Sequence, residues 1–247
     1  MQRTMTVKAA RSADISLRSE MRGYHEMRAR NHLRVYFPRL VHAAEGITDL
    51  DELPSEVSEW VGPGHECDVI VVSDEGPSVL SWLCSPEVQQ YSPEHRMDDL
   101  MVLMMRGLKT IGELREFGVA HQETLCKNVS IYGVLLTLDA VVMCDNVERA
   151  GPWHPERGIF PTYDKTRDGV DAFTFVESVW RLGPDWVRDP DGDFARARLQ
   201  SFNDRVLSES AIAHRGEFPC FLHPFEYTDI SWTTWKVYTI FDRILMN

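Results

Sequence analysis

The segment from Cys67 to Leu83, CDVIVVSDEGPSVLSWL, restricts the fold of this chain more than any other. It contains two short apolar runs, Val69 to Val72 and Val79 to Leu83, on either side of a polar turn that ends in Gly76-Pro77. Continuous apolar runs of this length, bounded by turn residues, are typical of strands that are buried on both faces. We therefore predict two adjacent antiparallel core strands joined at Gly76-Pro77.

Composition limits the class of protein. The chain has 247 residues, of which 43% are hydrophobic and 26% charged, as in one large globular domain or a domain with an extension. No stretch reaches the roughly 18 consecutive apolar residues of a membrane span, and the first forty residues hold no signal-peptide block, so we expect no membrane partner. The five cysteines form no CxxC pair, which favours buried thiols in a reducing, intracellular compartment, either cytoplasm or nucleus.

Charge is distributed unevenly along the chain. Residues 1–40 carry nine Arg or Lys against three acids, a net of +6, whereas the other 207 residues carry 17 against 35, a net of −18. An acidic body disfavours general binding to nucleic acid. For the basic segment we favour docking on the acidic body or on a protein partner, through Arg18, Arg22, Arg28 and Arg30. A nucleic-acid contact and a targeting segment are the alternatives.

Periodicity predicts the elements of the N-terminal part. Apolar residues at spacings of three and four indicate that residues 14–44 are mostly helical, with a break or kink at Pro38. The acidic, Pro- and Gly-rich connection that follows is expected to hold a short helix at Ser55 to Trp60 and an edge strand near Val61.

Further along, the clearest helix begins at Ser92-Pro93-Glu94, an N-cap followed by proline and an acid, and continues to Gly118 with a methionine-rich core face. Two strands, Val129 to Leu138 and Ala140 to Cys144, are predicted after it. Helices are then expected at 168–182 and after Asp193. Residues 229–245 favour a strand, with a helix as the open alternative.

Together these elements give an α-β-β-α-β-β order between roughly residues 14 and 146. With the segments CDVIVVSD, PSVLSWLCSPE, DDLMVLMMRGLKTIGELREFG and SIYGVLLTLDAVVMCDN, this part resembles the core of the PD-(D/E)xK, or restriction-endonuclease-like, superfamily. The resemblance implies an α/β (or α+β) fold with a mixed central sheet flanked by helices. We expect a basic, mostly helical arm at 1–40, an α/β core at 41–150 and a helical C-terminal elaboration at 151–247.

The same resemblance implies where a catalytic site would lie. In that superfamily an acid on the second strand and an E-x-K on the third hold Mg²⁺ and activate water, because carboxylate oxygens suit a hard cation and lysine stabilises hydroxide or phosphate. Asp68 matches the first acid, and strand alternation places Glu66 on its face as a second metal ligand. The E-x-K position falls on Leu83-Cys84-Ser85, which cannot do this work. Glu75 and Glu87 are the remaining carboxylates that could substitute.

A second, smaller resemblance is to the TOPRIM domain of primases and topoisomerases. VIVVSDEGPSVLSWL and VVMCDNVERAG place Glu75 and Asp145 at two of its four Mg²⁺ carboxylates, while Val79 and Val147 replace the other two. Two His/Glu pairs in loops are expected to be surface features: His154 with Glu156, and His223 with Glu226.

The missing E-x-K favours a protein that is not an enzyme. We expect a non-catalytic binding or assembly module on a degenerate nuclease-like core, with no cofactor. Its partner would be a protein or a second copy of the chain, and nucleic acid could bind through the arginine-rich arm. The alternative is an active Mg²⁺-dependent nuclease, or other phosphodiester-processing enzyme, with Asp68 catalytic and Glu66 and Asp68 as metal ligands.

Overall fold

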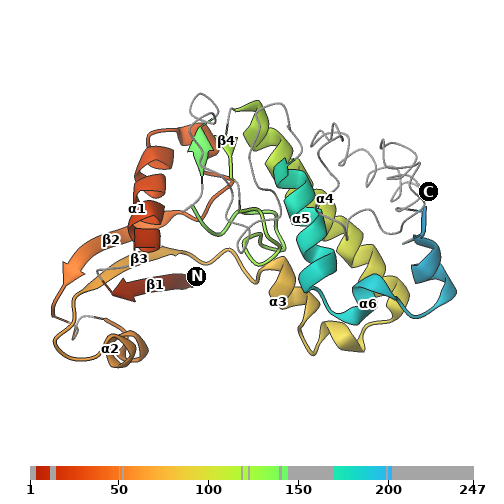
Figure 1. Cartoon of the computed structure of the whole chain (residues 1–247), viewed down its shortest axis with the longest axis horizontal. Helices are drawn as coiled ribbons and strands as arrows, with labels where there is room; N and C mark the ends of the chain where they lie inside the picture. Colours follow the sequence, from red (N-terminus) through yellow and green to blue (C-terminus); the bar gives the residue numbers. More distant parts are fainter. Residues whose placement is uncertain are drawn as a thin grey trace. The chain divides into compact units, whose positions relative to one another are not determined.

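The chain forms two compact units, each described by itself below (Figure 1). The N-terminal unit is Met1–Glu75 with Leu135–Val141, and the second unit is Gly76–Val134 with Val142–Asn247, so the division differs from the expected boundaries after residues 40 and 150. The structure, a computed structural model, describes residues 4–11, 15–49, 51, 53–117, 119–121, 123–138, 141–143, 170–198 and 200–201. Among these residues no helix is both long and apolar enough to cross a bilayer.

A three-stranded antiparallel sheet organises the N-terminal unit. Its order is β1 (Met5–Arg11), β3 (Cys67–Ser73) and β2 (Leu40–Ile47), with Val7 opposite Val71 and Ala43 opposite Ile70. The first predicted strand, Val69 to Val72, is thus confirmed as part of β3. Because β3 is central, both of its backbone edges are already paired within this sheet.

Two helices explain why the apolar run of β3 is continuous. Residues 67, 69 and 71 share one face, where Val61 at the end of α2 (Ser55–Val61) packs against Cys67 and Val69. The opposite face carries Asp68, Ile70 and Val72 and meets α1 (Ile15–Arg28), which lies beside β3 in Figure 1. A strand covered on both faces needs apolar residues at successive positions.

The helical prediction for residues 14–44 is right only for its first half. The α1 helix ends at Arg28, and a 3₁₀ turn, η1 (Asn31–Leu33), precedes Pro38 and β2. Proline prevents the helix from continuing, and the free edge of β3 then pairs with the following residues. The strand β1 was not predicted, so the supposed helical arm begins with a strand of the sheet.

Near residue 60 one prediction is confirmed and one is wrong. The short helix at Ser55 to Trp60 exists as α2, and it includes Val61, so there is no edge strand at Val61. The helix ends where Gly62 adopts a φ of 79°, which other residues disfavour.

The second strand of the predicted hairpin is also wrong. Val79–Leu83 is a helix, α3, in the second unit. Ser78 caps it, since its Oγ accepts a hydrogen bond from Ser81 N at 3.1 Å. Val79 and Leu83, four residues apart, are its buried positions. The buried residues of this apolar run therefore have the spacing of a helix. The strand β3 pairs with β1 and β2 and not with this run.

The long predicted helix is confirmed as α4 (Pro93–Glu116), which follows η3 (Val88–Gln90). Ser92 caps α4 by accepting from His95 N. The methionine-rich face packs into the core as predicted, with the following side chains fully buried: Met97, Leu100, Met101, Met104 and Leu108. The predicted helix at 168–182 is confirmed from Val170 as α5 (Val170–Leu182), and α6 (Asp185–Arg188) follows it.

The strand predicted at Val129 to Leu138 is wrong. The segment contains isolated bridge residues, among them Ser130 opposite Ser78, but no named strand. The preceding residues are instead attached to α5 by polar contacts: His121 N and Cys126 N donate to Asp171 Oδ2 and Ser178 Oγ, at 2.9 and 2.7 Å. Asp171 and Ser178 lie two turns apart on one face of α5, so they hold an irregular segment along the helix.

The only other described strands form a small ladder in the second unit. Within the predicted Ala140 to Cys144 strand, β5 (Val142–Met143) pairs antiparallel with β4 (Val119–Ala120). A helix is present at 193–198, and it includes Asp193, which was predicted as its cap. The mixed α/β class is confirmed, and every strand pair in the described ranges is antiparallel. The expected element at 229–245 lies outside the described residues.

Candidate functional site

Asp68, the predicted catalytic acid, is fully buried in the N-terminal unit. Its Oδ2 lies 2.7 Å from Arg18 Nε on α1, and its Oδ1 accepts a hydrogen bond of 2.9 Å from Gly46 N. Gly46 has a φ of 63° at a register irregularity of β2, and this bulge turns its N–H away from the ladder toward Asp68. Both carboxylate oxygens thus take part in joining α1 and β2 to β3.

Two further acidic side chains interact electrostatically with Arg18 near this contact. The pKa of the Arg18 guanidinium is raised, chiefly by its hydrogen bond and charge interaction with Asp68 and to a lesser extent by Glu45 and Glu66. Glu66, the second predicted ligand, is exposed directly before β3. In the described part of the chain, no three His, Cys, Asp or Glu side chains converge as metal ligands.

The remaining predicted site residues are dispersed. Leu83 to Ser85, at the E-x-K position, end α3 and its cap, so the strand that the motif requires is a helix. Glu75 Oε1 accepts from Ser73 Oγ, and Glu87 is exposed in the second unit. The other predicted residues lie outside the described residues: Asp145, Val147, His154, Glu156, His223 and Glu226.

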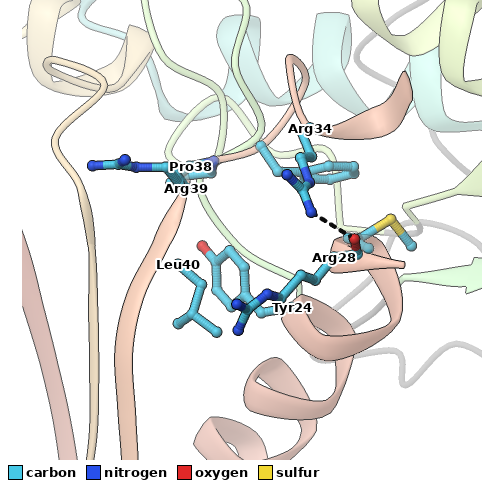
Figure 2. A pocket seen from close by; sticks show the side chains of 8 residues that line it. Tyr24, Arg28, Arg34, Pro38, Arg39 and Leu40 are labelled. Atoms are coloured by element: carbon cyan, nitrogen blue, oxygen red, sulfur yellow. Dashed lines mark hydrogen bonds between the residues drawn. The ribbon is translucent and has the colours of Figure 1, made fainter. Parts of the chain in front are cut away.

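A second feature of the N-terminal unit, which the sequence did not predict, is a pocket of about 390 Å³ between the end of α1 and the start of β2 (Figure 2). Three arginines and one tyrosine line it among apolar side chains, and no carboxylate is part of its lining: Tyr24, Met27, Arg28, Arg34, Phe37, Pro38, Arg39 and Leu40. A pocket with this lining attracts negatively charged groups.

The end of α1 and the turn after it position the arginines. Arg34 Nη2 donates to the Arg28 carbonyl oxygen at 2.9 Å, which satisfies one of the acceptors that the last turn of a helix leaves open. Figure 2 shows Arg34 extending toward Arg28, whereas the side chain of Arg39 extends away from both. Arg28 and Arg34 are therefore the two cations beside Tyr24.

Tyr24 brings an unusual polar atom to this pocket. Its side chain is only 3% exposed, and its hydroxyl is buried without a hydrogen-bond partner among the described residues. Such an atom costs free energy unless a ligand or water satisfies it. Burial raises the pKa of Tyr24 well above its usual value, and Glu20 and Glu75 raise it further, so the hydroxyl keeps its proton and can donate.

One signal in the sequence could have indicated the pocket. The segment RARNHLRVYFPR, residues 28–39, alternates arginines with aromatic residues and ends in Pro38. The prediction of a continuous helix over residues 14–44 concealed this feature, because the arginines of such a helix would project in several directions.

The chain matches no model of a known protein family, and a search of curated proteins gave no match to its sequence.

Proposed function

We propose that this protein is a non-catalytic binding or assembly module built on a degenerate nuclease-like α/β core. The observation that supports this proposal most is the arrangement at Asp68. A catalytic carboxylate needs oxygens that are open to a metal ion, and both oxygens of Asp68 are already engaged by Arg18 and Gly46. The guanidinium takes the position near the carboxylate where a cation would have to bind.

A binding role also agrees with the second feature of this unit. The pocket beside Tyr24 presents arginines and a buried donor, and nothing in its lining resembles a nucleophile with an adjacent base. We propose that the N-terminal unit recognises an anionic group there. The partner that carries this group is expected to be a protein, a second copy of the chain or a nucleic acid reached by the arginine-rich segment.

The proposed setting is a reducing, intracellular compartment. The described cysteines Cys67, Cys84 and Cys126 are free thiols, as is usual where disulfides do not form.

The alternative proposal, a Mg²⁺-dependent nuclease, is favoured by one observation. Glu45 and Glu66 raise the pKa of Arg18 in addition to Asp68, so acidic side chains add to the negative field in this part of the unit. Under this alternative Asp68 and Glu66 would be the ligands, and Mg²⁺ would supply the water activation that the missing lysine does not assist.

Cleavage assays separate the two proposals. Labelled single- and double-stranded DNA and RNA are incubated with the protein and Mg²⁺ or Mn²⁺. We expect no metal-dependent cleavage. Glu66→Gln is the informative variant, because Glu66 is exposed and its loss leaves the buried Asp68 contacts in place. Wild-type cleavage that disappears in this variant, with unchanged thermal stability, would overturn the binding proposal.

A further inference from the structure

We propose that the pocket at the end of α1 binds a phosphate monoester whose carbon group is aromatic or otherwise apolar. This inference rests on the proposed binding role and specifies the chemical class of the ligand. It combines two independent observations in one place: a pocket lined by arginines without a carboxylate, and a 97%-buried tyrosine whose hydroxyl has no partner among the described residues.

The donors of the pocket match a phosphate better than a carboxylate. A phosphate monoester carries between one and two negative charges near neutral pH and three acceptor oxygens. Arg28 and Arg34 offer two guanidinium groups, and Tyr24 adds one neutral O–H donor, so each phosphate oxygen can find its own donor group. A carboxylate has a single charge, so it would balance only one of the two guanidinium groups.

The arginine pair keeps donors available for a ligand. Arg34 uses one N–H in its hydrogen bond to the Arg28 carbonyl oxygen, and a guanidinium has five. Figure 2 shows the hydroxyl of Tyr24 directed away from α1, into the space that Arg28, Arg34 and Leu40 border. The nearby acids are themselves engaged: Lys8 Nζ pairs with Glu20 Oε1, and the Ser73 hydroxyl donates to Glu75.

The apolar lining determines the second half of the ligand. Met27 and Phe37 are buried, Pro38 is buried beside them, and Leu40 is half-buried. These side chains cannot hydrogen-bond to a sugar or a second charged group, but they can contact an aromatic ring or an alkyl chain. The volume of about 390 Å³ lies at the lower end of the range for small-molecule sites, which suits a single ring with its phosphate.

Isothermal titration calorimetry of this 247-residue chain with three probes tests this inference. Phenyl phosphate provides both the charge and the ring, inorganic phosphate only the charge, and phenol only the ring. We expect phenyl phosphate to bind at least about tenfold more tightly than either fragment, because only it uses both halves of the pocket. A fourth probe, adenosine 5′-monophosphate, distinguishes a nucleotide from a simple aryl phosphate as the preferred source.

Variants then assign the binding to these residues. Arg28→Gln and Arg34→Gln should each weaken phenyl phosphate binding about tenfold or more, since each removes a charge-assisted hydrogen bond. Arg30→Gln is the matched control: it removes the same charge from an exposed residue of the same segment that does not line the pocket, and affinity should change less than about twofold. Equal losses in all three variants would show a diffuse charge effect and overturn the proposal.

Tyr24→Phe gives a readout that a structural role would not produce. The hydroxyl has no partner in the described part of the protein, so its removal should leave the melting temperature unchanged or raise it, while phenyl phosphate affinity falls about fivefold. A lower melting temperature with unchanged affinity would make the hydroxyl structural and sink the inference. Failure of every probe to bind would overturn the phosphate site alone. Glu66-dependent cleavage would instead overturn the proposed function.

Discussion

The two units solve the same packing problem with different contacts. In the N-terminal unit a Cβ at Gly23 of α1 would lie 2.7 Å from the Leu138 carbonyl oxygen, whereas in the second unit a Cβ at Gly107 of α4 would lie 2.5 Å from Phe175 Cε1. Both positions require glycine because a neighbouring element comes too close for any side chain. The obstacle is backbone in the first case and the end of an aromatic side chain in the second, so only the second contact can adapt by repacking.

The buried carboxylates differ in a similar way. Asp68 of β3 is paired with a cation and with one backbone amide, whereas Asp171 lies in the first turn of α5 and accepts from His121 N. At the start of a helix the macrodipole and free N–H groups stabilise a negative charge. A strand provides no comparable dipole for Asp68. The buried negative charge of Asp68 therefore depends more on the side chain of Arg18.

The largest expected effect tests the glycine comparison. Gly107→Ala and Gly23→Ala should each lower the free energy of unfolding by about 3 kcal/mol, because the new methyl group overlaps buried atoms. Phe175→Leu should recover part of the loss in Gly107→Ala, since a shorter side chain makes room for the methyl. Leu138→Ala should recover nothing in Gly23→Ala, because the obstructing carbonyl oxygen and Cβ remain. Urea denaturation of the single and double variants measures these differences.

The comparison would be contradicted if the second substitution restored stability in both double variants. It would also be contradicted if it restored stability in neither. Each rescuing substitution is also measured in the wild-type background, where Phe175→Leu alone is expected to destabilise by about 1 to 2 kcal/mol through the space it leaves.

The second prediction concerns the carboxylates. Asp68→Ala should lower the free energy of unfolding by about 2 to 3 kcal/mol, because it leaves the Gly46 amide without its acceptor and Arg18 without its ion pair. Asp171→Asn should cost less, about 1 kcal/mol, since an amide oxygen can still accept from His121 N while the interaction of the charge with the helix dipole is lost. Asp68→Asn, the matched substitution, should lie between them. A larger loss for Asp171→Asn than for Asp68→Asn would reverse the comparison.

The third prediction examines the irregular segment that is held along α5 in the second unit, before the residues that were expected to form a strand. Ser178 Oγ accepts from Cys126 N at 2.7 Å and donates to the Phe175 carbonyl oxygen. Ser178→Ala should cost about 1 kcal/mol by leaving a buried amide unpaired. It should also increase amide hydrogen exchange at Cys126 more than at Ile70 in β3. Equal exchange at both sites would show that this contact does not hold the segment.

The elements that could be predicted from sequence are those with local signals. The α4 helix has an N-cap at Ser92 and a long apolar face, and the continuous apolar run of β3 indicates a strand covered on both sides. Five apolar residues at Val79 to Leu83 fit a strand or a helix equally well by pattern. The deciding feature is Ser78, a helix cap directly before the run that the strand prediction left out of account.

For the candidate site, the sequence indicated Asp68 but not the residues that contact it. Its partner Arg18 is 50 positions away, and the amide of Gly46 reaches it only through a bulge in β2. No local pattern predicts such pairings. The pocket was missed for a related reason: it exists only because the chain turns after Arg28 and then pairs with β3, and this turn depends on tertiary contacts rather than on propensity.

The smallest expected effect is a pH dependence of stability that comes from Tyr24 in the N-terminal unit. The pKa of Tyr24 is raised in the folded state above the usual 10.0, mainly by burial. Below pH 10 both folded and unfolded chains keep this proton, so the contribution to stability is fully present. Above pH 10 the unfolded chain releases it while the folded chain retains it, so the folded state binds more protons and stability falls as pH rises. At pH 10.5 the loss from this group should be about 0.8 kcal/mol.

Comparison with Tyr24→Phe isolates the contribution of Tyr24 to the pH dependence, because the titrating groups that both proteins share contribute equally to both curves. Cys126 of the second unit, whose pKa burial raises to about 11, titrates in the same range in both. We therefore expect the wild type to lose stability faster than Tyr24→Phe between pH 9.5 and 10.5, by about 0.7 kcal/mol in urea midpoints converted to free energy. Parallel curves would mean that the hydroxyl ionises freely in the folded protein. That outcome would also remove the argument that Tyr24 keeps its proton as a donor in the pocket.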